Sequence, residues 1–316
     1  MPAAGKLALL GAPLRSSLAT EGAESASTLL RTFAVSGAKL EGVEVTDAGD
    51  IPLPPPGTTD FLVGGPVPKN EGRVRESLLM IASRIADSVR TGATPVVFGG
   101  DATVLLGLLA GLHDGGVPSP RMGLLALDGA ARFQTATDSP GGDLSTMVLA
   151  LATGRGHISL AHLARDRFPL LQETDVLLAG VRDASPGEAA SLVASRVTLL
   201  PPDRLQGSGG EALFMGALGR LAQRTGDVVL HLDVSVLDPT QFPVGVDAPS
   251  PGGLSLERLK TLVGELSTWI SDGTIRISGV SVTGVDARKD PGGVRMHELA
   301  GFVLRLFGRR GGTGPA

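Results

Sequence analysis

The stretch Asp227-Val-Val-Leu-His-Leu-Asp-Val-Ser-Val-Leu-Asp-Pro239 begins as a mostly apolar run and ends in alternating polar and apolar residues. Short apolar runs that end at Asp, Gly or Pro are typical of strands buried on both faces of a parallel sheet. The pattern predicts a strand over 227–232, and His231, Asp233 and Ser235 share one side because side chains alternate along a strand. Since open α/β sheets bind ligands beyond the carboxyl ends of their strands, we expect a site just after this run.

Seven further apolar runs of the same kind alternate with segments that have helical periodicity. The other strands are predicted at 6–10, 43–45, 95–98, 123–127, 176–178, 196–199 and 275–282. Helices are predicted at 23–35, 71–90, 102–112, 187–194, 211–224, 255–270 and 296–307. Strands and helices that alternate over the whole length predict an α/β fold, a three-layer αβα sandwich around a mainly parallel sheet of about eight strands.

We find neither an internal repeat nor a shift in composition that would divide the 316 residues. A single α/β domain is therefore expected over residues 1–307, followed by a flexible tail at 308–316. The proline-rich segment 47–69 is interpreted as a long surface loop within that domain.

Composition excludes several classes of protein. The chain has no Cys, which removes disulfides, thiolate zinc sites and Cys nucleophiles. A net charge of −4 and 3% aromatic residues give no basis for binding nucleic acid. No apolar run reaches the roughly 18 residues that a membrane span needs, and the first apolar run is too short for a signal peptide. We therefore expect a cytoplasmic protein that does not contact a membrane.

Four predicted strands are each followed closely by an acidic residue: Asp101, Asp128, Asp183 and Asp233. This pattern is compatible with a shared site, but one Asp per loop is also ordinary helix capping, and Asp101 suits that second role. Asp183, together with Glu188, could recognise a small polar molecule or form a salt bridge.

These strand ends resemble motifs of the ureohydrolase family, which contains arginase, agmatinase and formiminoglutamase. Gly99-Gly-Asp-Ala102 resembles the family's Gly-Gly-Asp-His, and residues 128–132 fall where the family has Asp-Ala-His-Ala-Asp. The segments 139–147, 180–188 and 231–239 are similar to three further motifs in the same order. The resemblance extends from about residue 6 to 307. It implies the arginase-like fold and a homo-oligomer, a trimer or hexamer.

For the chemistry, the resemblance implies a loss. Family members hydrolyse a guanidine or amidine carbon with hydroxide that bridges two Mn²⁺ ions, held by two His and four Asp. By this alignment, the positions of both His and of two Asp are occupied by Ala102, Ala130, Arg132 and Ser235. Only Asp128 and Asp233 keep their identities.

Two substrate-binding positions of the family also differ. The late Glu that orients the guanidinium falls on Gly284, and the His of the substrate loop falls on Ser145. Two carboxylates alone would hold a metal pair weakly, and Arg132 adds a fixed positive charge. We therefore expect no cofactor, no metal site and no catalytic residue.

The resulting prediction is an arginase-like protein with a degenerate dimanganese site, not an enzyme, that binds a small guanidino or amino-acid ligand. Its ligand pocket is predicted to contain Asp101, Asp128, Arg132, Ser145, Asp183, Glu188, His231, Asp233 and Ser235. One alternative is a hydrolase of linear amidines or guanidines with altered or single-metal chemistry. Another is a scaffold subunit in a mixed oligomer with an active paralogue.

Two hypotheses concern the centre of this pocket. Without metal, Asp128 and Asp233 would be buried unpaired carboxylates, so we expect the guanidinium of Arg132 to bridge them. A mononuclear zinc site on His231 and Asp233 lacks a clear third ligand in the sequence. We therefore interpret His231 as a packed strand residue with a hydrogen-bonded ring.

Overall fold

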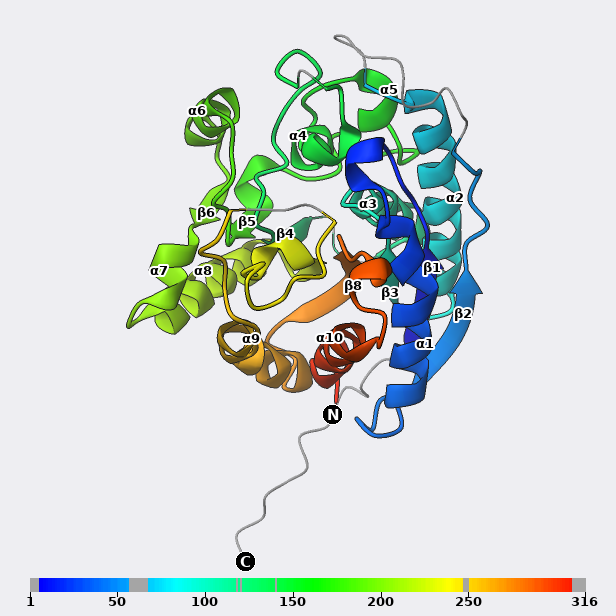
Figure 1. Ribbon diagram of the computed structural model, residues 1–316, viewed down its shortest axis with the longest axis vertical. Helices are drawn as coiled ribbons and strands as arrows, with labels where there is room; N and C mark the ends of the chain where they lie inside the picture. The colour runs from blue at the N-terminus through cyan, green and yellow to red at the C-terminus, as the bar shows by residue number, and fades with distance from the viewer. Residues whose placement is uncertain are drawn as a thin grey trace, which may run out of the picture.

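The computed structural model describes residues 6–56, 68–117, 119, 121–139, 141–246 and 250–308. In these residues, eight strands form one sheet (Figure 1). They are β1 (Leu7–Ala12), β2 (Val45–Asp50), β3 (Thr94–Gly99), β4 (Met122–Leu127), β5 (Val176–Ala179), β6 (Thr198–Leu200), β7 (Asp227–Asp233) and β8 (Arg276–Thr283). Every neighbouring pair is parallel, and the order is β2-β1-β3-β8-β7-β4-β5-β6. The predicted α/β architecture is confirmed.

Helices connect the strands. They are α1 (Ser27–Gly37), α2 (Glu71–Arg90), α3 (Val104–Gly115), α4 (Val148–Ala152), α5 (Ile158–Ala161), α6 (Pro186–Ala194), α7 (Pro202–Gln206), α8 (Gly210–Thr225), α9 (Leu256–Ser271) and α10 (Val294–Arg305). Short 3-10 turns lie at Leu18–Thr20, Ala23–Ala26, Leu144–Thr146, Glu173–Asp175, Val234–Val236 and Ala287–Lys289.

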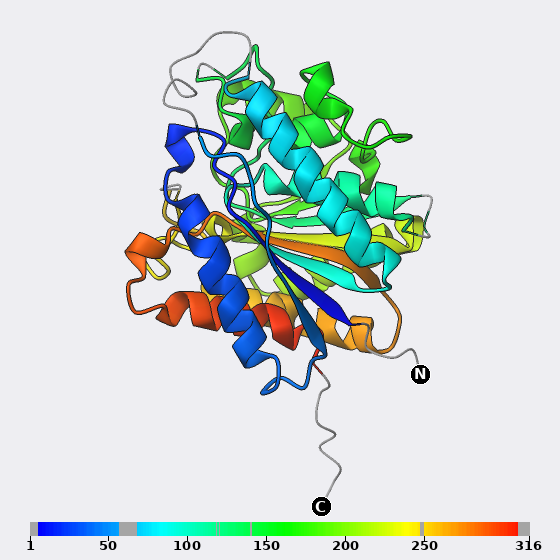
Figure 2. The ribbon, with the colours of Figure 1, turned by 90° about the vertical axis from the view of Figure 1, so that its right-hand side faces the viewer.

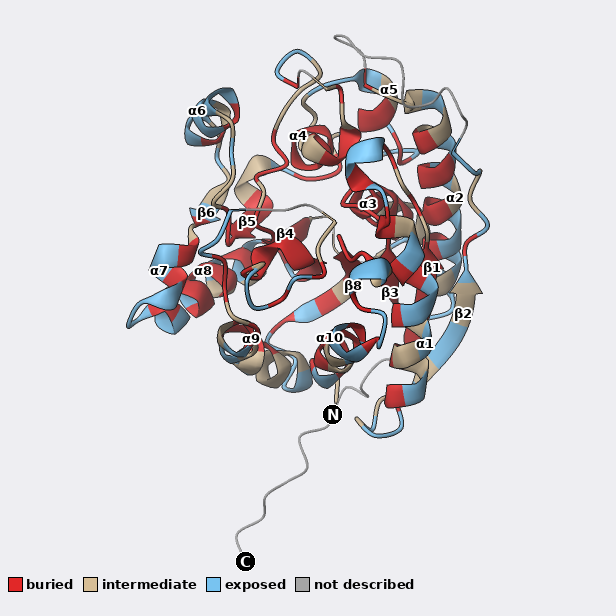
Figure 3. Cartoon of the chain, in the orientation of Figure 1, coloured by how far each residue is buried: buried red, intermediate tan, exposed pale blue. Residues whose placement is uncertain are grey.

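The helices cover both faces of the sheet, which gives the three layers (Figure 2). One buried apolar cluster joins the sheet to α1, α8, α9 and α10, and a second joins it to α2, α3, α4 and α5. Side chains of a strand alternate between these clusters: Leu7 and Leu9 belong to the first, and Ala8 and Leu10 to the second. Because both faces are covered, β1, β4 and β7 are buried along their whole length, and Figure 3 shows the centre of the sheet mostly as buried.

Strand pairing at the centre of the sheet brings distant polar residues together. In β7 and β8, His231 lies opposite Ser281, and Asp233 lies opposite Thr283. Leu127, the last residue of β4, lies opposite Leu232, so Asp128 emerges next to Asp233. The carboxyl ends of three adjacent parallel strands therefore converge on one point.

Predicted and observed elements differ mainly at the edges of the sheet. The strand predicted at 43–45 is instead β2, Val45–Asp50, which is largely exposed and pairs on one side only. An edge strand of this kind lacks the apolar pattern on which the prediction rested. The helices α4, α5 and α7 span four or five residues, which is too short for periodicity to reveal them.

The single domain over 1–307 remains a proposal. Of the predicted flexible tail, residues 309–316 lie outside the described residues, as do 57–67 of the proline-rich segment. Within the described ranges, no helix is long and apolar enough to cross a membrane.

Candidate metal centre

Three buried side chains converge where β4 and β7 end. Asp128 and Asp233 are each 1% exposed, and His231 is 2% exposed. One ligand atom from each, a carboxylate oxygen or an imidazole nitrogen, lies within 4.8 Å of the others. Among the described residues, Asp128, His231 and Asp233 are the acidic and His side chains that lie close enough together to hold a metal ion.

The two carboxylates are fixed by hydrogen bonds. Asp128 Oδ1 accepts from the Ala130 amide at 2.8 Å and from Ser235 Oγ at 2.7 Å. Asp233 Oδ1 accepts from the Ser235 amide at 3.0 Å, and its Oδ2 accepts from Thr283 Oγ1 at 2.7 Å. Ser235 therefore links the two carboxylates instead of adding a third.

The two carboxylates differ in their ease of ionisation. Burial raises the pKa of Asp128 to about 6, and the neighbouring charge of Asp233 adds to the rise although Arg132 opposes it. Burial also disfavours ionisation of Asp233, but Arg132, His231 and the hydrogen bonds from Ser235 hold its pKa below the ordinary value. Asp233 is therefore ionised at neutral pH, and Asp128 is ionised in most molecules.

His231 has the properties of a potential metal ligand. Burial, together with the charge of Arg132, lowers the pKa of His231 to about 4, so the ring is neutral at pH 7. Nδ1 lies 2.8 Å from Ser281 Oγ. Nε2 is buried, has no hydrogen-bond partner among the described residues, and lies 3.9 Å from Asp128 Oδ2. When Nδ1 donates to Ser281, Nε2 presents a lone pair toward the carboxylates, which is the form of imidazole that binds metals.

The predicted bridge by Arg132 is present. Its Nε donates to Asp128 Oδ2 at 3.0 Å, and Nη2 lies 3.5 Å from Asp233 Oδ1. Nη1 reaches the backbone oxygen of Ser145 at 3.4 Å. Arg132 is 5% exposed, so its charge belongs to the buried centre.

A cavity of about 360 Å³ opens beside this centre. Its lining includes Arg132, Arg182, Asp183 and Glu188. The carboxylate of Asp183 accepts from the amide and hydroxyl of Ser250 at 2.8 and 2.6 Å, which closes one side.

Glu188 also lines this cavity. Its Oε1 accepts from the Phe133 amide at 2.7 Å, while Oε2 accepts from the Ser185 amide in the capping box of α6. Glu188 therefore fixes the backbone next to Arg132, in addition to lining the cavity.

Asp101 lies apart from the cavity. Its carboxylate accepts from the Ser16 amide and hydroxyl, both at 2.7 Å, from Thr20 Oγ1 at 2.8 Å, and from the amide of Thr103 at 3.0 Å. These bonds join the loop after β1 to the start of α3. The structure thus places Asp101 in a loop-stabilising position rather than in the predicted pocket.

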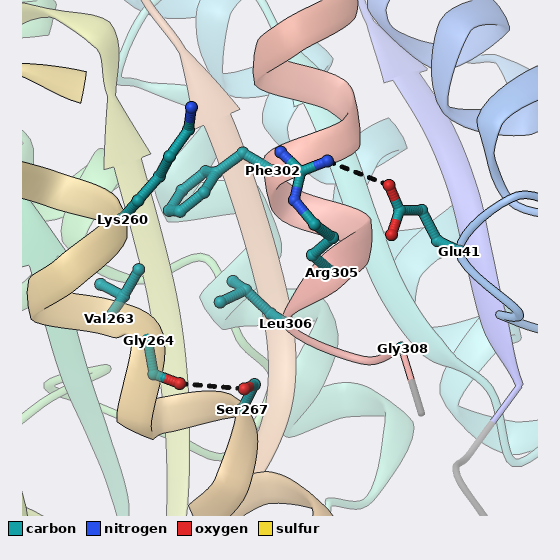
Figure 4. Close-up of a pocket in the computed structure, with 9 residues that line it drawn as sticks. All are labelled: Glu41, Lys260, Val263, Gly264, Ser267, Phe302, Arg305, Leu306 and Gly308. Atoms are coloured by element: carbon teal, nitrogen blue, oxygen red, sulfur yellow. Dashed lines mark hydrogen bonds and ion pairs between the residues drawn. The ribbon is translucent and has the colours of Figure 1, made fainter. Parts of the chain in front are cut away.

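A second cavity of similar volume lies between α9 and α10, away from the centre (Figure 4). Arg305 pairs with Glu41 at 3.0 Å across its rim. Lys260 pairs with Glu298, also at 3.0 Å. With its charged side chains engaged in these pairs, this cavity carries no arrangement that suggests chemistry.

The donor set fits one divalent ion. A neutral imidazole and two carboxylates match a mononuclear site with three protein ligands and open positions for water or substrate. Among the residues that the structure describes, a second ion finds no comparable set, because Ala102 and Ala130 offer only methyl groups and Arg132 is a cation. The expectation of no metal site is therefore wrong for one ion, because strand pairing supplies Asp128 as the missing third ligand.

Sequence reasoning missed Ser281 and Thr283, which orient His231 and Asp233. Both are fully buried polar residues in β8. They were detectable as polar residues at a spacing of two in an otherwise apolar run, a sign that one face of that strand meets polar groups.

Comparisons with known proteins identify relatives in sequence and in fold. The arginase of Bacillus caldovelox is 28% identical over 253 residues, 79% of this chain and 82% of that protein. The arginase of Brevibacillus brevis is 27% identical over 251 residues, 79% of this chain and 81% of that protein. The solved structure of the Bacillus caldovelox arginase superposes with a TM-score of 0.86 at 23% identity, covering 97% of this chain and 99% of that one. A formimidoylglutamase of Bacillus subtilis superposes with a TM-score of 0.72 at 18% identity, covering 96% and 86%.

These findings correct two expectations. The relatives are named for an enzymatic activity, which contradicts the expectation of a chain that is not an enzyme. The expectation of no cofactor is contradicted by the same relatives and by the group formed by Asp128, His231 and Asp233. The family model described as Arginase family matches residues 5–306, and this chain therefore belongs to the arginase family.

Proposed function

We propose that this chain is a hydrolase of C–N bonds in linear guanidino or amidino compounds, and that it uses one divalent metal ion. Asp128, His231 and Asp233 would hold the ion. The chemistry that such an ion supplies is acidification of a water molecule at neutral pH. The activity and the metal requirement are the parts of the family resemblance that the residues of this centre can still support.

The observation that carries the proposal is His231 Nε2. A buried nitrogen without a hydrogen-bond partner among the described residues costs about 1–3 kcal/mol, and proteins rarely leave one so. A metal ion would satisfy it. The neutral state of the ring at pH 7 also supports this role, because a protonated imidazole cannot be a ligand.

Substrate would enter through the cavity beside Arg132, whose volume of about 360 Å³ suits a small molecule. Asp183 and Glu188 contribute two carboxylates to its lining, beside Arg132 and Arg182, and a carboxylate there favours an amino or amidinium group. Gly284 leaves no carboxylate at the position of the family's orienting Glu, and a Cβ there would lie 2.7 Å from Asp233 Oδ1. We therefore place cation recognition on the cavity wall, away from residue 284.

The test combines metal binding with hydrolysis. Metal-stripped protein is titrated with Mn²⁺, Zn²⁺, Co²⁺, Ni²⁺ and Fe²⁺ by calorimetry, and bound metal is counted by elemental analysis. Loaded protein is then assayed for urea, ammonia or formamide released from arginine, agmatine, guanidinobutyrate and formiminoglutamate. We expect one ion per chain, and hydrolysis of at least one of these compounds that stops on chelation.

Two variants sharpen this test. His231→Leu removes a proposed ligand and should abolish both binding and hydrolysis. His113→Gln is the matched control, because His113 is also partly buried and hydrogen-bonded, to the Leu170 carbonyl at 2.9 Å, but lies at the end of α3. Absence of metal binding, or binding that His231→Leu leaves intact, would overturn the proposal.

Assembly is a separate proposal. From the family resemblance we propose a homo-oligomer, a trimer or hexamer. Light scattering after size exclusion measures the mass directly, with 32.1 kDa as the value for one chain. A monomer at micromolar concentration would contradict this proposal without affecting the metal site.

A further inference from the structure

We infer that Arg132 is the second cation of the metal centre, a fixed positive charge that limits the site to one ion and sets how tightly that ion is held. This inference rests on the proposed single-ion function. Arg132 would act through Asp128 and Asp233, the residues that it contacts, and is therefore a positioning residue rather than a ligand.

The contacts of Arg132 place its charge inside the centre. All three guanidinium nitrogens reach acceptors there, at 3.0 Å from Asp128, 3.5 Å from Asp233 and 3.4 Å from the Ser145 carbonyl. A guanidinium is always protonated and offers several donors in one plane, so it can serve two carboxylates together. The carboxylates of Asp128 and Asp233 are thus both paired with the guanidinium of Arg132 even before metal binds.

The backbone of Arg132 is also held in a fixed conformation by its neighbours. Arg132 has a φ of +52°, a left-handed conformation that is unfavourable for a non-glycine residue. Its carbonyl accepts from the Leu149 amide at 2.8 Å, and the next amide, of Phe133, donates to Glu188 at 2.7 Å. An unfavourable conformation fixed from both sides at a buried centre indicates that the position of this side chain matters to the site.

Charge balance then limits the occupancy. Two ionised carboxylates and one guanidinium sum to −1, and one divalent ion changes this to +1. A second ion would bring the buried centre to +3, which the described donors do not offset. Even with the dielectric constant of water, one positive unit charge about 5 Å from a divalent ion lowers the affinity of the site for that ion by more than about tenfold.

The experiment measures metal affinity in four proteins by calorimetry, with elemental analysis for the ratio. Arg132→Met removes the charge and keeps much of the shape, whereas Arg132→Lys keeps the charge. Arg121→Met is the matched control: Arg121 pairs with the fully buried Asp175 through Nη2 at 2.8 Å, but it lies at the opposite end of β4.

We expect wild type to bind one ion, Arg132→Met to bind it at least tenfold more tightly, and the other two variants to stay within about threefold of wild type. Arg132→Gly provides a second test should the Met variant not fold, because glycine accepts the positive φ. Millimolar methylguanidinium should then weaken metal binding to Arg132→Gly and leave the wild-type affinity unchanged.

The outcomes separate this inference from the proposed function. Absence of metal binding by wild type overturns the proposed function and this inference with it. Two ions in wild type, or affinity in Arg132→Met equal to or weaker than wild type, overturns the inference and leaves metal-dependent hydrolysis standing.

Discussion

The double variant His231→Leu with Ser281→Ala should be more stable than wild type when metal is absent, and should not bind metal. His231 is 2% exposed and Ser281 is fully buried, and they contact each other at 2.8 Å across β7 and β8. Replacing both partners of a buried hydrogen bond by apolar groups leaves neither unsatisfied. It also removes the unpartnered Nε2.

The expected magnitude follows from those groups. Loss of one neutral hydrogen bond removes about 1 kcal/mol, while elimination of an unsatisfied buried nitrogen returns about 1–3 kcal/mol. Leu has a volume close to that of His, so the strand retains its packing and gains buried apolar surface. The net expectation is a gain of about 1–2 kcal/mol. Ser281→Ala alone should instead cost about 1–2 kcal/mol, since it leaves His231 Nδ1 unpaired as well.

Urea unfolding in the presence of a chelator measures these differences, with circular dichroism as the signal and equal m-values as the condition for comparison. Calorimetry then tests metal binding by each variant. A double variant that is less stable than wild type in the chelator would refute the claim that the unpartnered Nε2 of His231 destabilises the metal-free protein. Retained metal affinity would refute its role as a ligand.

Three further predictions concern the surroundings of the centre. Gly284→Ala should cost about 2 kcal/mol or more and weaken metal binding, because φ is +80° and the new Cβ would lie 2.7 Å from Asp233 Oδ1; urea midpoints and calorimetry measure the two effects. Glu188→Gln should cost about 2 kcal/mol in urea unfolding, since the amide group cannot accept from both the Phe133 and Ser185 amides. Burial lowers the pKa of His113 below its ordinary 6.5, so the folded state binds fewer protons than the unfolded state and its stability falls as pH decreases through 6.5. His113→Gln should therefore reduce the difference between the urea midpoints measured at pH 7.5 and pH 5.5.

The central strands were predictable because burial on both faces gives them an unbroken apolar pattern. β7 was expected at 227–232 and spans Asp227–Asp233, and α2 matches its predicted range of 71–90. β2 was misplaced because an edge strand that is mostly exposed has no such pattern. Pattern reasoning therefore succeeds where burial leaves a regular apolar pattern, as in β7 and α2, and fails for an edge strand that has none.

The centre was predictable in its residues but not in its donor set. Asp128, Arg132 and Asp233 follow from strand ends and charge, whereas the third ligand for His231 depends on which strands are neighbours. Asp128 is 103 residues from His231 in the chain, and only the β4–β7 register places it there. The expected bridge by Arg132 already put Asp128 beside Asp233, but the distance from Asp128 to His231 depends on that register, so the group was not recognised as a possible metal site.

The arrangement has a consequence for what the centre binds besides metal. With one divalent ion, Asp128, Asp233 and Arg132 leave a net charge of +1 in a site where the side chains are almost fully buried. An uncompensated buried charge is unfavourable, so the loaded centre favours one monovalent anion beside the ion. A hydroxide ion, formed from water at neutral pH, would satisfy that requirement, and so would a carboxylate that enters through the adjacent cavity. Because these anions compete for one place, small carboxylates such as acetate should inhibit hydrolysis competitively. The inhibition should be weaker in Arg132→Met, because the metal-loaded centre of that variant, with both carboxylates ionised, is already neutral.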